Sequence, residues 1–516
     1  MILHESKRGL SVYKKVISLT LVCTMLLIAG CSSKDTSTNT NNDSSKSKVI
    51  PKVYVYNNSG AMQSGITSNP AKLESIKKVI VDEIGVEPVI IVPPTDVDGA
   101  KQKLNLLLSS GEELDIYWGD WQDYAPKKMI TSINDLLSKS GKDVTKNISA
   151  DFFQGMTDKD KKVWGIPRYT PTVAYPVWIR EDWLKKLNIT MPKTIDELDK
   201  ALKTIKASDP AGSGSTITML ADLKSLRYCF AGAFTEYGYS NFKDTDGKIK
   251  PAQSAPGYKD FLTKMHDWYA QGLITKEAFT YKTTQNVEYI KQNKVAATAL
   301  WYSRVSLNHG TLNQNFPEAN YQIASLTGTK GKAESVYPAS NVGLLFSANS
   351  KNQEAAMKLM NWYNSDVEHY IVGWAGVKDT DWKYKDEKNH IFELTNPTSK
   401  DYAGELNLGL GLFNEAKAAT YDPINIKHSN YLKDDILKLE RGKKPFDFGI
   451  SYDMTAVNTA VPNYADITKM QDEQEIKFIT GTRPLSEFDA YLSDLNKAGY
   501  DKYIAEISKQ YTSLTK

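Results

Sequence analysis

The sequence predicts an α/β protein made of two lobes, and three observations lead to this fold class. The chain has 516 residues, more than the about 250–300 residues over which a single hydrophobic core keeps growing. Predicted strands alternate with predicted helices, which is typical of βαβ units and favours a mainly parallel sheet in each lobe, flanked by helices. No segment of about 20–50 residues repeats along the chain, as it would in a solenoid or a propeller.

The alternation of elements begins soon after residue 50. Valine and tyrosine alternate over residues 52–56, which predicts a strand. Apolar residues then recur at helical spacing from Leu73 to Ile80, and a second helix is expected near residues 101–108. Apolar runs predict further strands at residues 89–92, 114–118, 163–166, 173–179, 295–301, 321–326 and 342–346.

Two later helices carry clear signals at their ends. A capping box at residues 194–197 predicts the start of a helix, and Asp209-Pro210 predicts its end. The last strong helix is expected to start at Ser486 and to end at Gly499, because glycine commonly follows the last helical residue.

Composition excludes some classes of protein. The 64 Lys and Arg residues nearly balance the 61 Asp and Glu residues, so the chain lacks the excess of basic residues that a nucleic-acid-binding protein needs. The 29 Tyr, 15 Phe and 10 Trp residues provide enough apolar surface to exclude wholesale disorder. The three cysteines cannot form a disulfide framework, and Cys229 is expected to be buried and inert.

The N-terminal 30 residues have the pattern of a signal peptide. Four basic residues precede an uncharged run over residues 16–30, which is too short for a membrane-spanning helix. The run ends in Leu-Ile-Ala-Gly before Cys31 and resembles a bacterial lipobox. This resemblance implies that Cys31 is diacylated and anchors the protein to the extracytoplasmic face of the cell membrane. Residues 31–50, rich in Ser, Thr and Asn, are expected to form a flexible tether.

Motifs for common enzymatic chemistry are absent from the sequence. There is no phosphate-binding loop, no H-E-x-x-H, no G-x-S-x-G and no paired C-x-x-C, and the six histidines are scattered. No catalytic residue, metal site or cofactor is therefore predicted. One alternative stays open, in which a carboxylate pair such as Asp151 and Asp158 serves a glycosidase. The segment Asp244–Gly247 resembles the start of a calcium loop, but Gln253 replaces the closing glutamate, so a β-turn is expected.

Aromatic residues stand beside polar ones at the ends of predicted strands, within residues 117–124, 164–169, 300–304 and 373–376. Ligands of open α/β sheets bind outside the carboxyl ends of strands. A sugar ring has apolar faces and a polar edge, so it suits flat aromatic side chains next to carboxylate, amide and guanidinium groups. For each tryptophan taken alone, a place in the core is the more common role, because aromatic residues dominate core burial. Residues of the required types are Trp118, Asp120, Trp121, Arg168 and Trp301.

Several segments together resemble the extracellular solute-binding lipoproteins of bacterial ABC importers, in particular the large oligosaccharide-type group of Bacillus and Paenibacillus relatives. The segments that carry the resemblance are residues 164–167, 178–184, 192–198, 268–274, 355–360, 478–481 and 499–503. The resemblance implies a two-lobed periplasmic-binding-protein-like fold of type II, with a hinge between the lobes. The N-terminal lobe would comprise residues 51–166 and 337–375, and the C-terminal lobe residues 167–336 and 376–516.

The resemblance also implies a function and a set of ligand-binding residues. The protein would capture an extracellular carbohydrate, as a monomer and without enzymatic activity, and deliver it to ABC permease subunits. No calcium is predicted at residues 211–216, because this segment has no acidic residue. A peptide or another non-sugar ligand, a surface carbohydrate-active enzyme and a signalling module remain alternatives. The residues expected to bind the ligand are Trp118, Asp120, Trp121, Arg168, Trp301, Tyr302 and Trp374.

Overall fold

The computed structural model describes residues 49–58, 69–94, 96–148, 150–168, 173–281, 283–395, 417–420, 423–435 and 442–515. The chain from Ile50 onward forms one compact unit. Within these ranges, no helix combines the length and the apolar character needed to cross a bilayer. The expected signal peptide, the lipidated Cys31 and nearly all of the tether lie outside the described residues.

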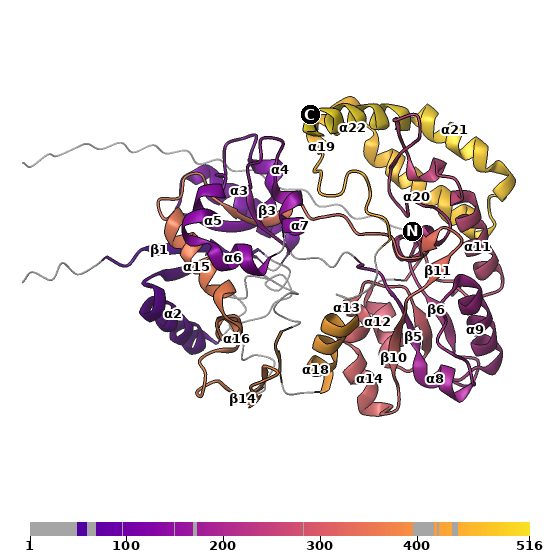
Figure 1. Ribbon diagram of the computed structural model, residues 1–516, viewed down its shortest axis with the longest axis horizontal. Coiled ribbons are helices and arrows are strands. Elements are labelled where there is room, and N and C mark those ends of the chain that lie inside the picture. The colour runs from indigo at the N-terminus through magenta and orange to yellow at the C-terminus, as the bar shows by residue number, and fades with distance from the viewer. Residues whose placement is uncertain are drawn as a thin grey trace, which may run out of the picture. The chain divides into compact units, whose positions relative to one another are not determined.

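The first lobe is built on a five-stranded sheet (Figure 1). Strand β1 pairs in parallel with β2 and β3, whereas β13, which comes much later in the chain, is antiparallel to β3 and β4. The sheet therefore joins segments that are distant in sequence. In spatial order its strands are β2 (Glu87–Ile91), β1 (Lys52–Tyr56), β3 (Ile116–Asp120), β13 (Val342–Phe346) and β4 (Gly165–Pro167).

Helices cover this sheet and complete the first core. Val53 and Val55 of β1 are fully buried against Ile76 and Ile80 of the following helix. That helix begins where the side chain of Asn69 accepts backbone N–H bonds, so its first turn is capped. The helices of this lobe are α2 (Pro70–Ile84), α3 (Val97–Ser110), α4 (Trp121–Tyr124), α5 (Asn134–Ser140), α6 (Lys142–Asn147), α7 (Ala150–Phe153), α15 (Gln353–Ser365) and α16 (Val367–Ala375).

The second lobe has a four-stranded sheet (Figure 1). Only β6 and β9 pair in parallel, and β5 is antiparallel to both of its neighbours. In spatial order the strands are β10 (Tyr321–Ala324), β5 (Val177–Arg180), β9 (Val295–Thr298) and β6 (Ile217–Leu220). The early helices of this lobe are α8 (Glu181–Lys186), α9 (Ile195–Ser208), α10 (Leu223–Phe230), α11 (Tyr258–Ala270), α12 (Thr283–Lys291), α13 (Ser303–Ser306) and α14 (His309–Asn315).

Three of the four predicted helix boundaries are confirmed, whereas the predicted start at Ser486 lies in a 3₁₀ turn (Leu485–Glu487) and the helix itself begins at Phe488. The Thr194 hydroxyl accepts the Glu197 N–H at 3.1 Å, and the Glu197 carboxylate accepts the Lys193 N–H at 2.7 Å, so the capping box opens α9. Helix α21 (Phe488–Ala498) ends at Gly499, which has φ 106°. One further helix, α22 (Tyr500–Thr515), follows without having been predicted.

The C-terminal helices pack on the second lobe around one buried ion pair. Arg227 of α10 donates to Glu475 at 2.9 Å, and Tyr258 donates to the same carboxylate at 2.8 Å. Both Arg227 and Glu475 are buried. The pair connects the C-terminal segment that contains Glu475 to the core of the second lobe. The helices described here are α18 (Pro423–Asn430), α19 (Met454–Ala460), α20 (Tyr464–Thr480), α21 and α22.

The structure corrects two expectations about the lobes. Neither sheet is mainly parallel: the first has two parallel and two antiparallel pairings, and the second has one parallel and two antiparallel pairings. The expected second segment of the C-terminal lobe, residues 376–516, also differs at its start. Trp382 of β14 (Trp382–Asp386) and Phe392 of β15 (Ile391–Leu394) pack in the first core, because both are fully buried among its residues.

Candidate functional site

A cavity of about 770 Å³ lies beside the segments that connect the two sheets. One of these segments follows β4 at Arg168, and the other leads into β13. The Arg168 N–H donates to the Val342 carbonyl at 3.1 Å, so the two segments lie side by side. The cavity is lined by Arg168, Tyr175, Asp222, Lys224, Asn286 and residues 300–304 and 337–342.

Three rings form one side of this cavity, and we call them the aromatic wall: Tyr175, Trp301 and Tyr337. The ring of Trp301 stands edge-on to Tyr175 at 5.3 Å and to Tyr337 at 5.5 Å between centroids. Tyr175 is buried and stacks on Tyr228 behind it at 5.4 Å, whereas Trp301 and Tyr337 are half-buried. The rings hold one another in place, and the two half-buried rings offer apolar surface to a ligand.

Three cations line the cavity together with one acid. The Lys224 ammonium lies 5.5 Å from the ring centre of Tyr337, a cation–π contact. Lys224 also donates to the Tyr337 hydroxyl at 3.4 Å, and the nearby Asp222 caps α10 by accepting the Ser225 N–H at 2.7 Å. Arg168 and Arg304 complete the set of cations, and Asp222 is the one acidic residue among the lining residues.

Amide side chains supply further polar groups. Asn286 is 4% exposed, and its Oδ1 has no hydrogen-bond partner in the described part of the chain. A buried acceptor without a donor is costly, so a ligand hydroxyl at this position would relieve it. The Asn341 side chain donates to the Asp120 carboxylate at 2.6 Å, and the backbone carbonyl of Asn341 accepts the Trp121 backbone N–H at 3.3 Å. Burial raises the pKa of Asp120 to about 6, although the Gln122 N–H lowers it in part.

The structure brings together three of the predicted ligand-binding residues. Arg168, Trp301 and Tyr302 all line the cavity, with Tyr302 buried and its ring 5.3 Å from that of Trp301. Asp120 does not line the cavity but positions Asn341, which does. Trp374 lies in α16, and its side chain is outside the described part of the structure.

The other two tryptophans lie in hydrophobic cores and do not line the cavity. Trp118 is 6% exposed and packs in the core of the first lobe. Trp121 is 8% exposed, stacks on Trp164 at 6.2 Å and donates its indole N–H to the Gly155 carbonyl at 2.8 Å. We therefore do not propose Trp118 and Trp121 as stacking surfaces for a sugar.

Sequence reasoning missed several residues of the cavity. Tyr175 lies just before β5 and Tyr337 in the second connecting segment, and neither stands in one of the aromatic clusters of the sequence. Tyr337 could have been found, because it is the first residue of the segment 337–375 that was expected to return to the N-terminal lobe. Lys224 and Asn286 come from helices whose connection to the cavity only the tertiary structure reveals.

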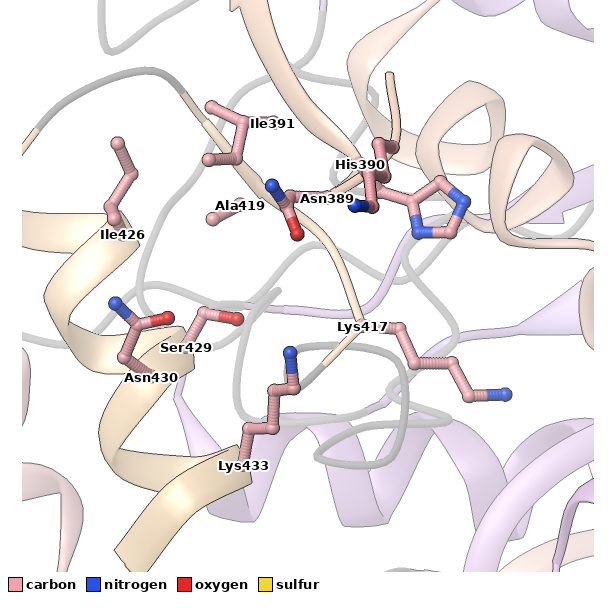
Figure 2. A pocket seen from close by; sticks show the side chains of 10 residues that line it. Asn389, His390, Ile391, Lys417, Ala419, Ile426, Ser429, Asn430 and Lys433 are labelled. Carbon is pink, nitrogen blue, oxygen red and sulfur yellow. The ribbon is translucent and has the colours of Figure 1, made fainter. Parts of the chain in front are cut away.

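A second cavity, of about 560 Å³, lies between β15, the short strand β16 (Ala419–Thr420) and α18 (Figure 2). Lys433 and Asn389 extend toward its middle, whereas Lys417 points away (Figure 2). No tryptophan, tyrosine or phenylalanine is among its lining residues. It therefore lacks the flat apolar surface that distinguishes the first cavity.

The described residues do not support a metal site or the glycosidase alternative. They contain no cluster of three or more His, Cys, Asp or Glu side chains that could hold a metal ion. Asp151 pairs with Lys444 at 2.9 Å, and Asp158 accepts the indole N–H of Trp164 at 2.9 Å, so each carboxylate has a structural partner. Asp244–Gly247 forms the expected β-turn, closed by the Gly247 N–H to the Asp244 carbonyl at 2.9 Å.

Comparison with known proteins identifies the family. The family model described as bacterial extracellular solute-binding protein matches residues 74–370, more than half of the chain. This chain belongs to that family. Its members bind solutes, so the chain is a solute-binding protein and not an enzyme. The fold class expected from the sequence, a two-lobed α/β binding protein, is thereby confirmed.

Individual relatives agree with this assignment. The fructooligosaccharide ABC transporter substrate-binding protein FusA of Streptococcus pneumoniae is 21% identical, covering 95% of this chain and 96% of its own length. The lipoprotein LipO of Bacillus subtilis is 23% identical over 97% of this chain and 98% of its own. Among solved structures, an extracellular solute-binding protein of Bifidobacterium longum subsp. infantis has a TM-score of 0.64 at 20% identity, covering 90% of this chain and 99% of its own.

Proposed function

We propose that this solute-binding protein captures an extracellular oligosaccharide and delivers it to the membrane permease of an ABC importer. The observation that carries the proposal is the aromatic wall, which faces a cavity of about 770 Å³ beside polar groups that have no partner among the described residues. Rings of Trp301 and Tyr337 can stack on the apolar face of a sugar, while Arg168, Asn286 and Arg304 can hydrogen-bond its edge.

The names of the relatives support a carbohydrate ligand. FusA is named as a fructooligosaccharide-binding component, and the structural neighbour NgtS of Streptococcus pneumoniae, with a TM-score of 0.62 at 18% identity over 90% of this chain and 99% of its own, is described as an N-glycan transport protein. These proteins bind different sugars on one fold. The identity of the sugar in this chain therefore depends on its own cavity residues.

Ligand capture follows from the two-lobed architecture. A ligand that contacts both lobes only when they are closed shifts the population toward the closed form. The closed complex then docks on a permease, whose separate ATPase subunits account for the lack of a nucleotide motif here. Cys31 carries the lipid anchor on the extracytoplasmic face of the membrane, and the protein acts as a monomer. Arg168, Trp301 and Tyr302 are the proposed ligand contacts that the sequence already indicated.

A thermal-shift screen of residues 49–516 tests the proposal. A ligand that binds only the folded protein raises its melting temperature, so one class of oligosaccharide should give a saturable increase. Micromolar affinity requires only about 8 kcal/mol, which a few stacked rings and charge-assisted hydrogen bonds supply. An increase with peptides alone would contradict the carbohydrate assignment, and release of new reducing ends would contradict a pure binding role.

The contribution of the aromatic wall is tested with a matched pair of variants. Trp301→Ala should weaken binding of the sugar found in the screen. Tyr269→Ala, which removes a half-buried ring outside the cavity, should leave affinity unchanged. Equal affinity of the two variants would place the site elsewhere.

A further inference from the structure

The arginines among the described residues fall into two groups. Arg180, Arg227 and Arg483 each form an ion pair with a carboxylate, at 2.6 Å, 2.6 Å and 3.1 Å. Arg168 and Arg304 form neither an ion pair nor a side-chain hydrogen bond within the described part of the chain. Both of these unpaired arginines line the cavity that contains the aromatic wall.

The cavity lining carries more positive than negative charge. Lys224 adds a third cation, and its ammonium lies over the rings of Tyr337 and Tyr175, at 5.5 Å and 5.9 Å from their centres. Asp222 is the one acid of the lining, and its carboxylate already caps α10. Cations gathered in a concave site without matching acids create a positive potential that attracts an anion.

The type of cation indicates the type of anion. A guanidinium group is planar and presents parallel N–H donors that match the two oxygens of a carboxylate, and such charge-assisted pairs are among the stronger hydrogen bonds of proteins. A neutral sugar hydroxyl uses only one of these donors and leaves the positive charge uncompensated. The cavity therefore combines a surface for a sugar ring with receptors for a negative charge on that ring.

We infer that the oligosaccharide is acidic: it contains uronic acid residues, whose carboxylates are bound by Arg168 and Arg304 while the rings stack on the aromatic wall. This inference rests on the proposed function and specifies the substrate class of the same cavity. It makes the charge of the ligand, rather than its size, the main determinant of selectivity.

Calorimetric titration with matched ligands tests the inference. The probes are trisaccharides of galacturonate, mannuronate and glucuronate, each compared with its carboxyl-methyl ester, which keeps the ring and removes the charge. At least one acid should bind, and its ester should bind about 10- to 100-fold more weakly, as expected for loss of charge-assisted hydrogen bonds. The affinity for the acid should also fall as salt concentration rises.

Variants locate the effect in the cavity. Arg168→Gln and Arg304→Gln should weaken binding of the acid far more than binding of its ester, and so lose most of the preference for the acid. Arg483→Gln, which removes a guanidinium outside the cavity, should keep the full preference. The comparison of acid with ester in the wild-type protein does not depend on the folding of any variant.

The outcomes separate the inference from the proposed function. Tight binding of neutral oligosaccharides with no binding of any uronate would overturn the inference and leave the carbohydrate importer intact. Equal binding of acid and ester would do the same, as would a preference for sulfated sugars over uronates. Failure of every saccharide, charged or neutral, would overturn both.

Discussion

Replacing Glu334 by glutamine should make the protein more stable at neutral and alkaline pH. Glu334 lies between β12 (Gly331–Lys332) and the segment that leads into β13. It is 2% exposed, and neither carboxylate oxygen has a partner with hydrogen-bonding geometry in the described residues. Burial raises the pKa of Glu334 from 4.5 to about 7, although nearby backbone N–H groups and Lys332 lower it in part.

The pKa of Glu334 sets both the sign and the size of the effect. Between pH 4.5 and about 7, the unfolded chain releases this proton while the folded chain keeps it, so folded-state stability falls as pH rises. The loss is complete above the folded pKa and amounts to about 3 kcal/mol, at about 1.4 kcal/mol per pH unit. Glutamine has nearly the shape of the protonated acid and does not titrate.

Urea unfolding of residues 49–516 at pH 4.5 and at pH 8 measures this difference. The free energies of unfolding of wild type and Glu334→Gln should be nearly equal at pH 4.5, and the variant should be more stable by about 3 kcal/mol at pH 8. Glu236→Gln is the control, because Glu236 is exposed and its pKa is lowered by Lys443; it should give no gain at pH 8. A stability difference for Glu334→Gln that does not change with pH would refute the reasoning.

Three further predictions follow from burial. Trp118→Ala should lower the free energy of unfolding by about 3–5 kcal/mol, because it leaves a cavity in the core of the first lobe. Trp301→Ala should instead weaken ligand binding by about tenfold and change the free energy of unfolding in urea little. Burial raises the pKa of the Cys229 thiol, which donates to the Tyr175 carbonyl at 2.7 Å, so a thiol reagent such as Ellman's reagent should react with it only after unfolding. Glu475→Gln should cost about 3–5 kcal/mol, measured by denaturation, because it removes the buried partner of Arg227 and leaves this guanidinium only the exposed Asp472 as a counter-charge.

Local signals in the sequence predicted the elements better than their pairing. The capping box of α9 and the glycine after α21 are set by neighbouring residues, so they were found correctly. Strand direction depends on contacts between distant segments: β13 joins the first sheet antiparallel although it belongs to the second half of the chain. Alternation of strands and helices cannot reveal such a return, which is why mainly parallel sheets were expected.

The sequence predicted a residue of the candidate site correctly only where a side chain of a suitable chemical type also faces the cavity. Trp301 and Trp118 look alike in sequence, since each ends a predicted strand beside polar residues. In the structure Trp301 is half-buried on the cavity, whereas Trp118 points into the first core. Whether a side chain at the end of a strand faces solvent or the core depends on how the helices pack against the sheet. Lys224 and Asn286 were missed for a related reason, because each comes from a helix rather than from a strand end.

The residues that hold the fold and those that define the cavity are largely separate. Arg168 is exposed, Arg304 and Trp301 are half-buried, and neither arginine has a side-chain partner in the described residues. Replacement of these side chains therefore removes few of the contacts that stabilise the lobes, in contrast to Glu475 or Trp118. A fold of this kind can change its ligand by exchanging cavity residues while its cores stay the same. Family membership thus establishes the role of a solute-binding protein, and the inferred acidic ligand makes the charge of the cavity lining the feature to test for selection of the solute.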